Sequence, residues 1–286
     1  MMTILFDGIA YGMLLFLISV GLSVTLGLMN FVNLAHGAFA MLGGYACVIL
    51  LNDYGVPFLA TLPVAILVPA IVGAILERVL YRRLYAASDL DQVLFSIGLV
   101  FMAVAAAHYF FGAQQQPLHL PEFLSGQIHV MQGLDVGVYR LFLIFAGLLV
   151  ALLLQWSVIR TSFGARLRAS VDNQRVARGL GIDVSRVFSL TFALGSALAG
   201  LGGALGVEML GLDPEFPVKY LVYFLIVVSV GGSGNILGSL YAAILLGVAD
   251  VAGKYYVPQI GAFIIYAVMV ATLIYRPHGL FGRAHK

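Results

Sequence analysis

Nine stretches of mainly apolar residues, most about twenty residues long, constrain what this chain can fold into. Polar residues, glycine or proline separate them, and they lie at 4–28, 32–51, 58–77, 93–112, 139–159, 187–208, 218–231, 236–253 and 259–275. A helix needs about 20 such residues to cross the hydrocarbon core of a bilayer. The sequence therefore predicts an all-α fold, a polytopic transmembrane helical bundle of about 8 to 10 spans, in which the short seventh stretch leaves the count open.

The composition agrees with a membrane protein and excludes several other classes. Hydrophobic residues make up 62% of the chain and charged residues only 10%, whereas a soluble domain carries about a quarter charged residues. A net charge of +2, with no concentrated basic face, does not suit nucleic-acid binding. The single Cys47 excludes an intramolecular disulfide and a cysteine-based metal site. The first apolar stretch is longer than the core of a signal peptide, so we interpret it as a retained span.

The basic residues predict an orientation. Twelve of the fifteen lie in the three segments 78–83, 160–186 and 276–286. The positive-inside rule places such segments in the cytoplasm. Nine crossings then alternate without contradiction, with the N-terminus outside and the C-terminus inside.

The longest external segment, 112–138, contains two prolines and short apolar stretches. We expect a short surface helix here, serving either as a docking surface for an external partner or as a loop that caps the bundle. No low-complexity tract or soluble linker interrupts the chain. Residues 1–286 are therefore interpreted as a single transmembrane domain with a cytoplasmic loop at 160–186.

No catalytic constellation or phosphate-binding loop is present, so the chain is not expected to be an enzyme, and any ATP would bind a separate subunit. Titratable groups at mid-depth, which an ion-coupled carrier needs, are also scarce. Glu208 and Asp250 lie near predicted span ends. A lone His108 is more often a packing residue than a proton relay.

Two polar interruptions break the apolar pattern. The first, 27–37, contains Asn30, Asn33, His36 and Gly37. Backbone that leaves a helix inside a membrane must be covered by protein or line a water-filled cavity, so this segment indicates a broken or re-entrant helix along a pathway. A plain cytoplasmic turn with asparagine caps is the alternative. The second interruption is Gly231-Gly232-Ser233-Gly234-Asn235, followed by Gly238; a pathway turn and a simple inner loop remain open.

Small residues are concentrated in the sixth stretch, where Ala199, Gly202, Gly203 and Gly206 form two small-xxx-small pairs. Such spacing allows helix backbones to approach closely. We expect close helix packing here, either within the chain or against a second membrane subunit.

The second basic loop predicts a short amphipathic helix. Leu167 and Val171, then Val176 and Leu180, are i,i+4 pairs with arginines on the other faces,. Such a helix can lie on anionic lipid of the inner leaflet or sit in a groove of a cytoplasmic protein.

These segments together resemble a known family, the permeases of branched-chain amino acid ABC importers (the LivH class). The matching segments are the interruption 30–37 with Gly43-Gly44-Tyr45, the turn 231–238 and the tail 276–282. Matching loop residues are Phe163, Gly164, Arg168, Ala169, Asn173, Ala177, Gly181 and Ile182. The resemblance covers the chain from end to end.

The resemblance implies a permease in a bacterial inner membrane. Its partners would be a homologous second permease, two cytoplasmic ABC ATPases that bind ATP and magnesium, and a periplasmic substrate-binding protein. The chain itself would bind no cofactor and no metal. The loop residues above, with Arg166, would couple ATP hydrolysis to transport.

We expect uncharged hydrogen-bonding groups and turn glycines to line the translocation path: Asn30, Asn33, His36, Gly37, Gln92, Ser96, Gly231, Gly232, Ser233 and Asn235. Such groups accept a zwitterion without trapping it. Branched-chain or other hydrophobic amino acids are the expected substrates, with urea, amides or small carboxylates as the alternative. A channel or ion-coupled carrier is less favoured because the sequence lacks a selectivity filter, and a pure scaffold would leave the polar breaks without a purpose.

Overall fold

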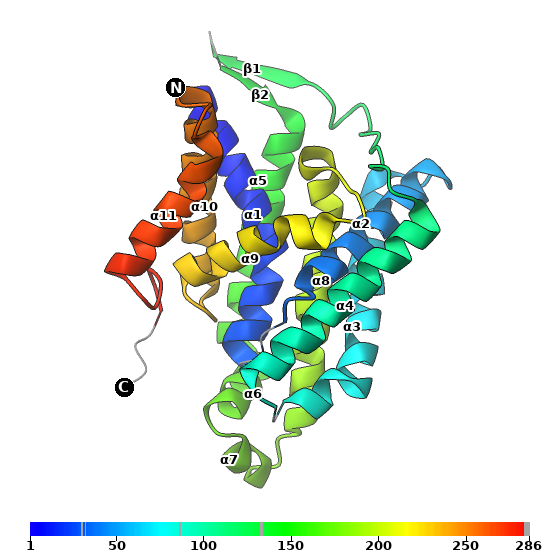
Figure 1. Ribbon diagram of the computed structural model, residues 1–286, viewed down its shortest axis with the longest axis vertical. Coiled ribbons are helices and arrows are strands. Elements are labelled where there is room, and N and C mark those ends of the chain that lie inside the picture. Colours follow the sequence, from blue (N-terminus) through cyan, green and yellow to red (C-terminus); the bar gives the residue numbers. More distant parts are fainter. Residues whose placement is uncertain (30, 32, 86, 132–133, 283–286) are drawn as a thin grey trace.

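The computed structural model describes residues 1–29, 31, 33–85, 87–131 and 134–282. In this part of the chain the nine apolar stretches form helices that pack side by side (Figure 1). They are α1 (Met2–Met29), α2 (His36–Asn52), α3 (Phe58–Val79), α4 (Asp89–Phe111), α5 (Val138–Arg160), α8 (Val184–Leu210), α9 (Phe216–Gly231), α10 (Ile236–Tyr256) and α11 (Gly261–Tyr275). The predicted helical bundle is confirmed.

Six of these helices, α1, α3, α4, α5, α8 and α10, are long and apolar enough to cross a membrane. Helices α2, α9 and α11 are shorter, with 17, 16 and 15 residues. In Figure 1, α9 runs across α1 and α8 instead of along them. The short length of α9 and its direction agree with the expected broken segments. A helix that begins inside the bundle needs fewer residues than one that crosses the whole membrane.

The centre of the bundle is formed by α1 and α8, whose residues are mostly buried, whereas α3, α4 and α5 expose most of their length. Helix α8 packs against α1, α2 and α3. Its small residues allow this: Gly202 lies against Ile18 of α1, Gly203 against Ala40 of α2, and Gly200 against Ala65 of α3. A methyl group on Gly203 would overlap the Ala40 carbonyl oxygen. The packing made by these glycines is therefore within the chain.

The segment after α4 contains no surface helix among its described residues, so that expectation was wrong. It ends in an antiparallel hairpin of β1 (Gln127–Met131) and β2 (Leu134–Gly137), in which Ile128 pairs with Val136. Prolines at 117 and 121 remove backbone donors that a helix needs, and the β-branched residues favour a strand. We call this end of the molecule, which also holds the start of α1, the hairpin end (Figure 1).

The opposite end, which we call the loop end, holds α6 (Ser162–Asp172) and α7 (Gln174–Gly179). The single helix expected here is thus two helices. Asn173 between them has extended backbone, and its Oδ1 accepts hydrogen bonds from the backbone N–H groups of Arg175 and Val176. Asparagine ends α6 and caps α7 because its side chain replaces the missing helical partners.

Candidate functional site

The site is the junction where α1 ends and α2 begins. Asn33 lies in this junction and is buried. Its Oδ1 accepts hydrogen bonds from the Ala35 N–H at 3.1 Å and from the Tyr81 hydroxyl at 3.0 Å. Protein groups therefore satisfy the buried Asn33 side chain, as a polar group inside a membrane requires. The predicted path residue Asn30 lies outside the described residues.

His36, the first residue of α2, connects this junction to two other helices. Its Nε2 lies 3.0 Å from the Ile18 carbonyl oxygen of α1. Because a carbonyl can only accept, Nε2 carries the proton. The imidazole ring also contacts Phe224 of α9 edge to face, and the neighbouring Gly37 packs against Pro217. The first turns of α2 and α9 thus meet at His36 and Gly37.

Tyr81 closes the junction from the side of the 3₁₀ helix η1 (Tyr81–Leu84). It is fully buried, and its ring contacts those of Phe31, Phe95 and Phe192. Burial raises the pKa of the Tyr81 hydroxyl above its usual value,. The hydroxyl therefore stays protonated and can donate to Asn33.

Helix α4 turns its buried face toward the same region. Gln92 and Ser96 lie on this face, one turn apart, followed by Val100 and Val104, which pack against Ala35. Gln92 donates a hydrogen bond to the Leu84 carbonyl of η1 at 3.3 Å. The structure thus places two further predicted path residues on the α4 face that covers the junction and η1.

A buried carboxylate near the junction was missed by the sequence analysis. Glu77 of α3 is fully buried and accepts hydrogen bonds from Tyr85, at 2.7 Å, and from Ser189 of α8. Arg82 lies 3.8 Å from it. Burial is the main cause that raises the pKa of the Tyr85 hydroxyl, and the hydrogen bond to the Glu77 carboxylate raises it further,. The hydroxyl therefore keeps its proton and can donate to Glu77.

The available signal for Glu77 was the spacing Glu77, Tyr81, Tyr85, with aromatic residues at i+4 and i+8 from an acidic residue inside an apolar stretch. The apolar stretch 58–77 ends at Glu77, next to the basic segment 78–83, and the sequence analysis did not single this residue out.

The second interruption contacts the first. Gly232 and Gly234 have positive φ, and Gly234 packs directly against Gly27 of α1. The segment 276–282 covers this turn: Leu280 N–H donates to the Val230 carbonyl at 2.8 Å, and the Asn235 side chain donates to the Phe281 carbonyl at 3.2 Å. Gly231 is buried, whereas Ser233 is exposed. The glycines thus allow a tight turn against the end of α1.

The predicted coupling residues form a compact unit at the loop end. Leu167 and Ala177 are buried, and Arg168 donates a hydrogen bond to the Val158 carbonyl at the end of α5. Gly181, with φ of 81°, follows α7. The N–H of the next residue, Ile182, donates a hydrogen bond to the Ala177 carbonyl. Phe163, Ala169 and Ile182 are partly buried, and Gly164 packs on Val158.

The outer surface of this unit is apolar as well as basic. Val171, Val176 and Leu180 are 38%, 57% and 75% exposed, and Arg166, Arg168, Arg175 and Arg178 are exposed around them. Of the four residues in the two expected apolar pairs, Leu167 is buried and the other three are exposed.

Comparisons with known proteins confirm the resemblance to the permease family. Residues 4–273 match the family model described as a branched-chain amino acid transport system permease component. A probable branched-chain amino acid transport permease protein, LivH, of Methanocaldococcus jannaschii is 29% identical over 98% of this chain and 92% of its own length.

Two further relatives come from bacteria. The high-affinity branched-chain amino acid permease BraD of Pseudomonas aeruginosa is 26% identical over 98% of this chain and 95% of its own length. The permease LivM of Salmonella typhimurium is 26% identical over 94% and 68%. No solved structure matches the chain.

Proposed function

The chain belongs to the family of branched-chain amino acid transport permeases, and from this premise we propose that it forms the membrane path of an ATP-driven importer for branched-chain or other hydrophobic amino acids. Membership makes it a non-enzymatic subunit of an ABC transport system. Its apolar helices make it a multi-pass membrane protein.

The observation that carries the proposal is the exposed apolar and basic surface of α6 and α7. Val176 and Leu180 expose most of their side chains at the end of a membrane protein. Buried apolar area is the main source of affinity in protein interfaces, so this surface suits a groove in a partner. The partner we propose is a cytoplasmic ABC ATPase, one of two that bind ATP and magnesium.

The remaining partners follow from the same scheme. A periplasmic substrate-binding protein would dock at the hairpin end, which places the N-terminus in the periplasm and the loop end in the cytoplasm of a bacterial inner membrane. A homologous permease would complete the membrane unit; LivM-type relatives of this chain exist. The whole chain, 1–286, would act as one permease domain.

We assign the translocation path to the junction. Asn33, His36, Gln92 and Ser96 would surround it, and Gly37 and the turn 231–235 would extend it. Asn30 stays a predicted path residue outside the described part of the chain. In this conformation Asn33 and His36 form hydrogen bonds with Ala35, Tyr81 and Ile18 of the same chain, and we interpret this arrangement as the closed state of the path. Opening requires these hydrogen bonds to exchange protein partners for water or substrate.

The mechanism follows from the connection between the coupling unit and α8. Helix α8 begins at Val184, directly after α7, and packs on α1, α2 and α3. ATP-driven closure of the ATPases would push α6 and α7 and shift α8 relative to these helices. The junction would then open to one side of the membrane at a time.

The test begins with an affinity pull-down of the tagged chain from native membranes in mild detergent, with partners identified by mass spectrometry. We expect stoichiometric ABC ATPases and a second permease. The purified assembly, reconstituted with its binding protein, should take up L-leucine only with ATP. Uptake by the chain alone, or without ATP, would instead support a channel or carrier. Uptake of urea, acetamide or a small carboxylate in place of leucine would move the substrate to the alternative class.

A further inference from the structure

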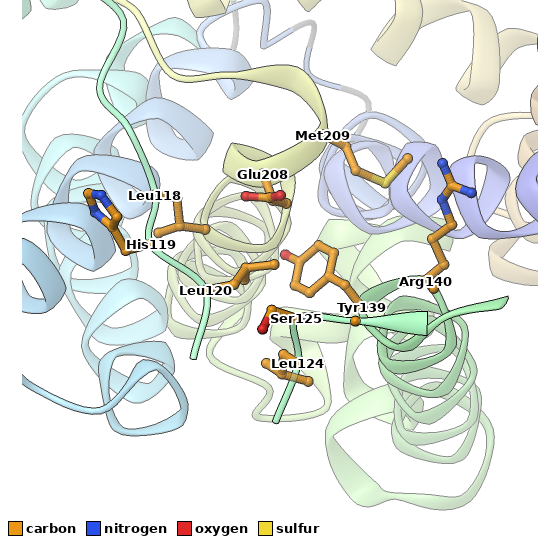
Figure 2. A pocket seen from close by; sticks show the side chains of 11 residues that line it. Leu118, His119, Leu120, Leu124, Ser125, Tyr139, Arg140, Glu208 and Met209 are labelled. Atoms are coloured by element: carbon orange, nitrogen blue, oxygen red, sulfur yellow. The ribbon is translucent and has the colours of Figure 1, made fainter. Parts of the chain in front are cut away.

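A cavity of about 680 Å³ opens at the hairpin end, away from the junction. The segment 118–126, the start of α5 and the end of α8 surround it (Figure 2). Its volume lies within the usual range of small-molecule sites, roughly 300–1,000 Å³. None of the predicted path residues lines this cavity.

One wall of the cavity carries a carboxylate without a partner. Glu208, near the end of α8, forms no hydrogen bond or ion pair with another described residue. Glu208 is exposed, and Figure 2 shows its carboxylate toward the hydroxyl end of Tyr139. The Tyr139 hydroxyl is occupied, since it donates to the Leu205 carbonyl at 2.6 Å. Glu208 is therefore available to a ligand.

The other charged and polar lining groups already have partners. Arg140 forms an ion pair with Asp7 of α1, and His119 lies 3.5 Å from the Asn52 side-chain oxygen. The free charge in the cavity is thus negative. A ligand that binds to Glu208 must therefore carry a cationic group. A carboxylate on the ligand would gain little from Arg140, because Arg140 is already paired with Asp7.

Apolar side chains make up part of the remaining lining, beside Ser125 and the glycines 126 and 137. Leu118, Leu120 and Leu124 come from the external segment, and Met209 follows Glu208 on α8. Such a lining matches a molecule with a cationic head and an aliphatic tail.

We propose that this cavity binds the ammonium group of a hydrophobic amino acid on Glu208, with the aliphatic side chain against Leu118, Leu120, Leu124 and Met209. This inference rests on the proposed function, because it gives the substrate a first binding site at the hairpin end before it reaches the junction. One charged partner in an open cavity supports only weak binding. Weak binding suits a site that must release its ligand toward the junction.

The test compares Glu208→Gln with Glu215→Gln in the purified transporter assembly without its binding protein. Glu215 follows α8 at the same end, is 60% exposed and lies outside the cavity, so it is a matched control. Saturation-transfer NMR would titrate three probes: L-leucine, 3-methylbutylamine, which lacks the carboxylate, and 4-methylpentanoate, which lacks the ammonium. Charge-assisted hydrogen bonds predict a loss of affinity of about tenfold or more in Glu208→Gln.

We expect the wild type and Glu215→Gln to bind leucine and the amine, neither to bind the carboxylate, and Glu208→Gln to lose the amine. Equal binding of the amine by all three proteins, or by none, would overturn the cavity assignment.

Uptake of leucine into proteoliposomes separates this result from the proposed function. Glu208-dependent amine binding without ATP-driven leucine uptake would refute the function and leave the cavity assignment intact. Uptake that is equal in wild type and Glu208→Gln, with equal amine binding, would refute only the cavity.

Discussion

At the scale of single residues, hydrogen bonds at the junction decide which polar side chains a membrane interior can hold. Asn33 and His36 stand out in the sequence as polar groups in an apolar stretch. The structure gives each of them a partner far along the chain, Tyr81 for Asn33 and Ile18 for His36. Unpaired polar groups are costly in lipid, so these partners explain how the break is tolerated.

The double variant Asn33→Ala, His36→Ala tests the junction. We expect it to reduce leucine uptake severalfold in the reconstituted transporter, because the Tyr81 hydroxyl and the Ile18 carbonyl each lose a partner and each loss costs about 1–3 kcal/mol. Gln114→Ala with Asp53→Ala, both exposed residues away from the junction, is the control. Transport equal to that of the wild type would remove the junction from the path.

Glu77 gives a second prediction at this scale. Glu77→Ala leaves Tyr85, Ser189 and Arg82 without their shared acceptor, and breaking a buried charged network costs about 3–5 kcal/mol. We expect a markedly lower melting temperature in detergent. Glu122→Ala, at an exposed site, should melt as the wild type does; a similar melting temperature for both variants would show that Glu77 contributes little.

At the scale of elements, α8 holds the bundle together through its glycines. Gly203→Ala should lower the melting temperature of the purified chain, since the new methyl group overlaps the Ala40 carbonyl of α2 and forced overpacking costs about 1–3 kcal/mol. Gly206→Ala is the matched control, because its methyl group would lie 3.4 Å from the nearest atom, Leu210 Cδ1, at the flexible end of a side chain. Equal melting temperatures would mean that α2 and α8 can separate without loss.

The coupling unit gives the next prediction. Leu180→Asp should leave the fold intact, because Leu180 is 75% exposed, but it should reduce ATP-driven uptake by about tenfold or more by placing a charge in an apolar interface. The same change at Leu90, which is 65% exposed at the start of α4, is the control. This test is cleaner than Arg168→Glu, because Arg168 also caps the end of α5 through Val158.

At the scale of the whole molecule, one prediction concerns the orientation of the chain in the membrane. The basic segments predict that α6 and α7 face the cytoplasm and the hairpin faces outward. A membrane-impermeant maleimide should therefore label Phe123→Cys in intact cells, and Arg178→Cys only after the membrane is disrupted. Phe123 is 60% exposed and Arg178 is also exposed. The wild type is the background control because its Cys47 is buried. The reverse pattern would invert the topology.

The sequence by itself determined the helices and their order, because the need for about twenty apolar residues per span leaves a direct record along the chain. The nine expected stretches coincide with nine helices in the described residues. The tight turn at Gly232 and Gly234 also follows from local chemistry, since glycine tolerates positive φ. The sequence prediction was wrong at two places. A hairpin replaces the expected surface helix, and Asn173 divides the expected loop helix into α6 and α7.

Only the tertiary structure decided which polar residues meet. Glu77 and Ser189 lie 112 residues apart, and Asn33 and Tyr81 48 residues apart, so no local pattern reports that they share a hydrogen bond. The same holds for Asp7 and Arg140, which form an ion pair although they lie 133 residues apart. Helix formation in a membrane is local because each helix satisfies its own backbone. The pairing of side chains depends on how the helices pack, which is a property of the whole chain.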